Sequence, residues 1–76
     1  MSLRFTDNQA VDFDTKDTKL EAFVKNTSQR IVVRVTMEAI ADYSIEAIRS
    51  AAAAKYDSGQ FETNGDLIVR DYDIQN

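Results

Sequence analysis

Acidic side chains near the N-terminus form the densest group of candidate metal ligands in the chain. Asp7, Asp12, Asp14 and Asp17 supply carboxylate oxygens, which hard cations such as Ca²⁺ and Mg²⁺ prefer. The run D-F-D-T-K-D, however, lacks the glycine and the distal glutamate of a calcium-binding loop. We therefore interpret this segment as a solvated acidic loop, and we expect neither a metal ion nor a cofactor.

The amino-acid composition excludes many kinds of catalysis by this chain alone. It has no His and no Cys, so it lacks the usual general base, the thiolate nucleophile and disulfide bonds. Lys55 and Asp57 could be imagined as an acid and a base, but residues two apart on a helix do not face each other. We read them as surface residues and expect a protein that is not an enzyme. An enzyme that uses only carboxylates and Tyr is the least favoured hypothesis.

A mixed charged and aromatic surface is expected on one face of a hairpin over residues 19–36. Alternation along the two strands places four cations, one carboxylate and two apolar side chains on that face. We define the candidate interaction face by five of its residues: Phe23, Lys25, Arg30, Val32 and Arg34. The other members of this face are Lys19 and Glu21.

Three functions fit such a face. Cations around an aromatic side chain are typical of a single-stranded nucleic-acid platform, but there is only one Phe, and the net charge of −4 opposes binding to nucleic acid. The face could also be solvated, with Phe23 packed on Val32, or it could contact a protein. We hypothesise a protein-interaction or accessory module, with weak binding of single-stranded nucleic acid as the alternative.

The hairpin itself follows from alternating apolar residues in strands 18–26 and 30–36. The inner positions are even-numbered on the first strand and odd-numbered on the second, so paired numbers must sum to an odd value and the loop must have even length. The loop Asn26-Thr27-Ser28-Gln29 satisfies this condition. It pairs Val24 with Ile31 on the inner face and Glu21 with Arg34 on the outer face.

Two helices are expected after the hairpin. Thr36 can cap a helix over 37–43, Ser44 can cap a second over 45–57, and Gly59 can end it in a left-handed conformation. One helix kinked at Tyr43 remains an alternative, although its acidic side chains would repel each other at i, i+4 spacing. The buried stripe of the second helix comprises Ile45, Ile48, Ala51, Ala52 and Tyr56.

The two ends of the chain complete the predicted sheet. Residues 3–5 read as a short edge strand, residues 6–9 as a turn and residues 7–17 as irregular. Asn64-Gly65 predicts a second hairpin, with strands 60–63 and 66–70 and a Thr63-Asn64-Gly65 turn. We expect one α+β domain over 1–76 with an antiparallel sheet, the order β-β-β-α-α-β-β and both helices on one face.

Several segments resemble the small bacterial family catalogued as domain of unknown function 1488 (DUF1488). The residues that carry the resemblance are Leu3-Arg4-Phe5-Thr6-Asp7, the run from Val33 to Ile40, Ile45-Glu46-Ala47-Ile48, the run from Ala54 to Phe61, and Asn64-Gly65. Thr6 stands where the family often has Pro, and Arg34 stands where it often has Cys. The resemblance implies an α+β fold in the bacterial cytoplasm and implies no activity.

Location and association follow from what the sequence lacks. No apolar run approaches the length of a membrane helix, which needs about 20 residues, and the first residues lack the apolar core of a signal peptide. We expect a cytoplasmic protein that does not contact membranes. A short chain without Pro leaves strand edges unprotected, so we expect a homodimer, formed by edge pairing or by the Phe23 and Val32 face, or an unidentified protein partner.

Overall fold

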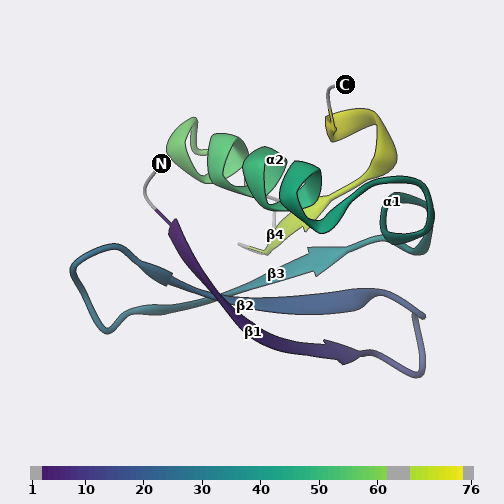
Figure 1. The fold of residues 1–76 in the computed structure, drawn as a ribbon, viewed down its shortest axis with the longest axis horizontal. Helices are drawn as coiled ribbons and strands as arrows, with labels where there is room; N and C mark the ends of the chain where they lie inside the picture. The colour runs from purple at the N-terminus through teal and green to yellow at the C-terminus, as the bar shows by residue number, and fades with distance from the viewer. Residues whose placement is uncertain (1–2, 62–65, 75–76) are drawn as a thin grey trace.

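One four-stranded sheet and two helices make up the fold (Figure 1). The computed structural model describes residues 3–61 and 66–74. In chain order the elements are β1 (Leu3–Val11), β2 (Thr18–Val24), β3 (Arg30–Val35), α1 (Met37–Asp42), α2 (Ile45–Asp57), β4 (Leu67–Val69) and the 3₁₀ helix η1 (Asp71–Asp73). The predicted α+β class is confirmed, and so is the predicted order as far as β-β-β-α-α-β; within the described residues one strand follows α2, where two were predicted.

The core lies between the sheet and α2, which covers one sheet face (Figure 1). Small alanine side chains let the helix lie close to the strands, and Ala51 and Ala52 are buried as predicted, together with Ile48. The sheet contributes the inward side chains of its strands. The core cluster comprises Leu3, Leu20, Ala22, Val33, Val35, Ala39, Ile48, Ala51, Ala52, Leu67, Val69 and Ile74.

The sheet is mixed, whereas we predicted an antiparallel one. The strand order is β1-β2-β3-β4, and β4 runs parallel to β3, because the crossover through both helices brings the chain back in the same direction. Gln60 and Phe61 are not in a strand, and the Phe61 ring instead meets Tyr56 edge-on at 5.8 Å between ring centres. The rest of the predicted strand 60–63 and the Thr63-Asn64-Gly65 turn lie outside the described residues.

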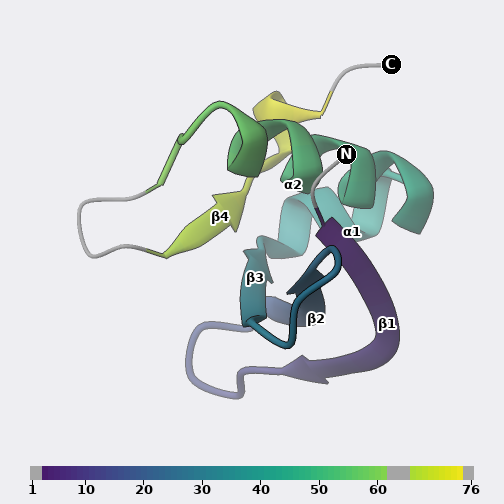
Figure 2. The same ribbon diagram turned by 90° about the vertical axis from the view of Figure 1, so that its left-hand side faces the viewer.

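β1 is much longer than the predicted strand of residues 3–5. The predicted turn at 6–9 is instead an interruption within the strand, where pairing with β2 lapses between Phe5 and Gln9 and then resumes. Figure 2 shows β1 bending around the edge of the sheet. The acidic loop closes the β1–β2 hairpin, since Asp12 N–H donates to the Asp17 carbonyl at 2.8 Å.

The β2–β3 register differs by two residues from the predicted one. Ala22 faces Ile31 and Leu20 faces Val33. The loop begins one residue earlier than predicted, because Val24 N–H donates to the Gln29 carbonyl at 3.0 Å and Asn26 takes the left-handed conformation at φ 64°. A shift of two residues preserves the parity of the pairing, so the inner and outer faces are those predicted.

The helix boundaries match the sequence closely. Thr36 Oγ1 accepts from Ala39 N–H at 3.4 Å, and Ser44 Oγ accepts from Ala47 N–H at 3.2 Å. Tyr43 is extended, so the chain has two helices and not one kinked helix. Gly59 follows Ser58, the C-cap of α2, and has φ 71°, the left-handed conformation that ends a helix.

Candidate functional site

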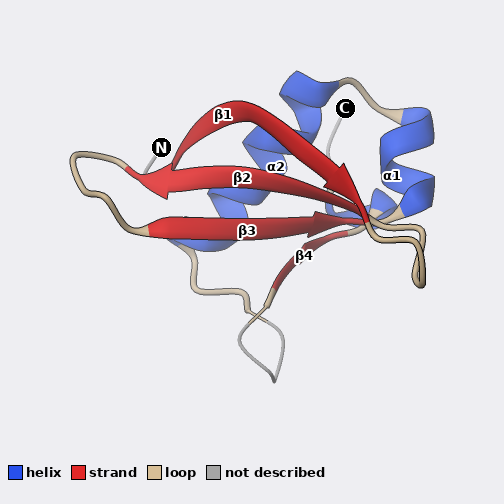
Figure 3. Cartoon of the chain, turned by 90° about the horizontal axis from the view of Figure 1, so that it is seen from below, coloured by secondary structure: helices blue, strands red, loops and turns tan. Residues whose placement is uncertain are grey.

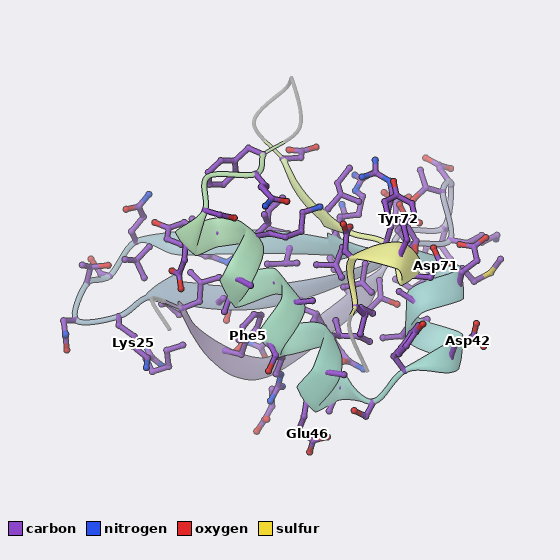
Figure 4. All side chains as sticks on the ribbon, turned by 90° about the horizontal axis from the view of Figure 1, so that it is seen from above. Phe5, Lys25, Asp42, Glu46, Asp71 and Tyr72 are labelled. Atoms are coloured by element: carbon purple, nitrogen blue, oxygen red, sulfur yellow. The ribbon has the colours of Figure 1, made fainter. Side chains whose placement is uncertain are left out.

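The sheet has one face that neither α1 nor α2 covers, and it is fully visible in Figure 3. We call it the outer face. Strand pairing and alternation place these side chains on it: Arg4, Ala10, Lys19, Glu21, Phe23, Arg30, Val32, Arg34 and Ile68. Four of the five predicted interaction residues lie there. Lys25 does not, because β2 ends at Val24 and Lys25 lies in the exposed loop at the end of the hairpin (Figure 4).

Glu21 is the centre of a hydrogen-bond network on the outer face. Its carboxylate accepts from Arg30 Nε at 2.6 Å, from Thr6 Oγ1 at 3.0 Å and from Asn8 Nδ2 at 3.0 Å. The Arg30 hydrogen bond, followed by those from Asn8 and Thr6, holds the pKa of Glu21 below its ordinary value. Glu21 therefore joins β3 to the interrupted part of β1, and it does not face Arg34 as predicted.

Carboxylates of the acidic loop pair with the cations at the other end of this face. Asp12 Oδ2 lies 3.6 Å from Lys19 Nζ and 3.9 Å from Arg34 Nη2, and Asp17 Oδ2 lies 3.8 Å from Arg34 Nη1. Backbone N–H groups of Asp14 and Thr15, and then Lys19, lower the pKa of Asp12. Asp12 and Asp17 thus serve as partners for protein cations. Within residues 3–61 and 66–74, no group of three or more acidic side chains is arranged to hold a metal ion.

These ion pairs weaken the nucleic-acid hypothesis. Lys19, Arg30 and Arg34 each have a carboxylate partner, so little positive charge is left for phosphates. The Arg4 guanidinium carbon lies 5.2 Å from the centre of the Phe23 ring, within cation–π range, and occupies a place where a base would stack.

A hollow of about 310 Å³ opens on the outer face beside the β1 interruption. Asn8 and Gln9 of β1 line it, together with Glu21, Arg30 and Val32. Val32 is 40% exposed, and Phe23 is half-buried. The outer face therefore combines exposed apolar area with charges that are already paired.

The sequence reasoning missed Lys55 as a structural residue. It is 8% exposed, and its ammonium donates to the Ile68 carbonyl at 2.6 Å and to Asp73 Oδ2 at 2.9 Å. Our interpretation of Lys55 as a surface residue beside Asp57 is therefore wrong. The spacing from Ile48 and Ala52 to Lys55 continues the buried stripe of α2, and that signal could have identified it.

Asp73 is the half-buried partner of this lysine. Burial raises its pKa, but the Arg70 backbone N–H, at 2.9 Å from Oδ2, and the Lys55 ammonium outweigh burial, so the pKa lies below its ordinary value. Asp73 is thus held as a carboxylate that can accept from both groups.

Comparison with known proteins adds evidence on the fold. None of the helices within the described residues is long and apolar enough to cross a membrane. No protein-family model matches the sequence, and no curated protein matches it at a significant level. Among solved structures, a protein of unknown function from the DUF1488 family of Shewanella loihica PV-4 is similar, with a TM-score of 0.72 and 15% identity over 90% of this chain and 91% of that chain. The resemblance to DUF1488 is therefore confirmed at the level of the fold.

Proposed function

We propose that this chain is a non-enzymatic protein-interaction module that self-associates through the outer face of its sheet. The observation that carries the proposal is the uncovered sheet face itself, with Val32 40% exposed beside the half-buried Phe23 (Figure 3). A sheet face with exposed apolar side chains gains free energy when another surface covers it.

The small size of the molecule, 31 by 27 by 27 Å, favours a dimer. A chain of 76 residues also buries a small fraction of its surface on folding, so it gains proportionally more from association than a larger protein does.

The charges on the outer face permit two copies to approach each other. Glu21 neutralises Arg30, and Asp12 and Asp17 neutralise Lys19 and Arg34. A surface on which both signs alternate avoids the like-charge repulsion that a uniformly basic surface would impose on its own copy. For the same reason a second copy fits this face better than a nucleic acid does.

Composition supports the non-enzymatic part of the proposal, since the chain has no His and no Cys. The resemblance to a bacterial family supports a bacterial origin, and we place the protein in the cytoplasm on the basis of the sequence expectations above.

Sedimentation velocity of paired variants tests the proposal. Phe23→Lys places a new cation beside Arg4 on the outer face, whereas Tyr72→Lys makes the same kind of change on the helix side of the molecule, where Tyr72 is 75% exposed (Figure 4). We expect the wild type and Tyr72→Lys to dimerise at high micromolar concentration and Phe23→Lys to remain monomeric.

Three results would contradict the proposal. The first is a wild type that stays monomeric throughout, and the second is loss of the dimer in Tyr72→Lys alone. The third is a monomer that binds a fluorescent oligonucleotide at physiological salt, with the affinity reduced by Phe23→Lys.

A further inference from the structure

The two edges of the sheet, β1 and β4, would each be open to another strand unless their outward backbone groups were occupied. One hydrogen bond fixes the direction of the backbone N–H and C=O groups of β4. The Val69 carbonyl accepts from Thr36 N–H at 3.1 Å, so it points toward β3. In a parallel pair alternate residues point the same way. Ile68 therefore directs both its N–H and its C=O away from β3, toward the edge.

The Lys55–Asp73 pair occupies two of the groups that an added strand would use, the Ile68 carbonyl and the Arg70 N–H. The Lys55 ammonium donates to the Ile68 carbonyl at 2.6 Å, and it also donates to Asp73 Oδ2 at 2.9 Å. That oxygen also accepts from Arg70 N–H at 2.9 Å, the next group along the chain that an added strand would use. A buried lysine at this position is a strong obstacle to strand addition, because an incoming strand would have to displace a charged, hydrogen-bonded side chain.

A second cation from α2 contacts β1, the strand on the opposite side of the sheet. Arg49 Nη2 donates to the Thr6 carbonyl at 3.1 Å, and Thr6 lies in the stretch of β1 where pairing with β2 lapses. The Arg49 guanidinium also lies 5.6 Å from the centre of the Phe5 ring. Figure 4 shows α2 lying across the sheet, with Phe5 of β1 beside it.

We propose that α2 acts as an edge guard, in which Lys55 closes the β4 edge so that the chain does not associate by pairing of its β4 strands. The added strand that Lys55 excludes from the β4 edge is the β4 strand of a second copy of this chain. Two β4 strands related by a twofold axis would pair antiparallel, with Ile68 of each copy at the centre of the new ladder. This inference concerns the edges alone and does not depend on the outer-face dimer.

Lys55→Met tests the edge guard, because Met fills a similar volume without the ammonium. At equal concentration we expect this variant to form assemblies larger than those of the wild type, because the affinity of the β4 edge for a second copy should rise about tenfold, the factor expected from one or two net hydrogen bonds. Lys25→Met, in the exposed hairpin loop, is the matched control and should behave as the wild type does.

Ile68→Pro identifies the edge as the cause. The Ile68 N–H does not serve the β3–β4 ladder, so Pro is tolerated there, as on other edge strands, but it removes the donor that an added strand needs. The double variant Lys55→Met/Ile68→Pro should sediment as the single variant Ile68→Pro does, because neither can add a strand at the β4 edge. If Lys55→Met fails to fold by circular dichroism, Asp73→Asn replaces it, since it loosens Lys55 and weakens the cover of Arg70 N–H. The proposal is overturned if the folded variant sediments as the wild type does, or if Ile68→Pro fails to reverse its association.

Discussion

Adjacent valines on β3 offer a direct test of the face assignment on which the account rests. Val33 is fully buried between the sheet and the helices, and Val32 is 40% exposed on the outer face. Val→Ala removes the same two methyl groups at each position. Burial of each such group is worth about 0.8 kcal/mol, and a buried site adds a cost for the cavity that remains.

We therefore expect Val33→Ala to lower the free energy of unfolding by about 2–3 kcal/mol and Val32→Ala to lower it by less than about 1 kcal/mol. A chain of this length has a total of roughly 4–11 kcal/mol, so the larger loss is easily measured. Urea unfolding followed by far-ultraviolet circular dichroism gives both values, and an unchanged m-value shows that the two variants unfold to comparable states. Equal losses would refute the assignment of the faces. In the same way Val33→Asp should abolish cooperative folding, because it buries an unpaired charge, while Val32→Asp should be tolerated.

Three further predictions concern the helix ends and the Lys55–Asp73 ion pair. Gly59→Ala should lower the melting temperature and reduce the free energy of unfolding by about 1 kcal/mol. The reason is the backbone conformation, φ 71°, because no atom lies within 4 Å of an added Cβ. An unchanged melting temperature would argue against strain at this site. Ser44→Ala should cost about 1 kcal/mol in urea unfolding, since it removes the cap of α2, and a larger effect in Ser50→Ala than in Ser44→Ala would contradict the cap. The pKa of Asp73 is lowered in the folded state, so its contribution to stability is present above the unfolded pKa and is lost as the pH falls below about 4. In Asp73→Asn the free energy of unfolding should therefore fall less steeply as the pH is lowered below about 4. The same decrease in both proteins would refute this role.

Local chemistry was sufficient to predict the helices and the faces of the strands. Thr36 and Ser44 cap as expected, Gly59 ends α2, and the alternation of apolar residues assigns each side chain of β2 and β3 to the correct face. These features depend on residues a few positions apart, so a single sequence contains the information.

Features that depend on distant contacts were not predicted. Parity restricts the hairpin register but allows shifts by two residues, and the left-handed Asn26 selects one of them. The direction of β4 depends on the path of the chain through both helices, which no local pattern encodes. Lys55 was misread because its partners, Ile68 and Asp73, belong to segments that meet α2 only in the folded chain.

The candidate site was predicted in part for the same reason. Alternation correctly grouped Phe23, Arg30, Val32 and Arg34 on one face. The pairing of Lys19 and Arg34 with Asp12 and Asp17 was not foreseen, because the acidic loop had no expected position relative to the hairpin.

A dilution series followed by methyl and aromatic NMR spectra tests the central claim, association through the outer face, most directly. As the concentration rises from low to high micromolar, we expect the resonances of Val32, Phe23 and Ile68 to shift together along one binding curve, while those of Ala51 in the core of the helix side stay constant. Phe23→Lys should abolish the shifts. The account is contradicted if no resonance of the outer face depends on concentration, or if the concentration-dependent shifts fall on α2 and Tyr72 instead.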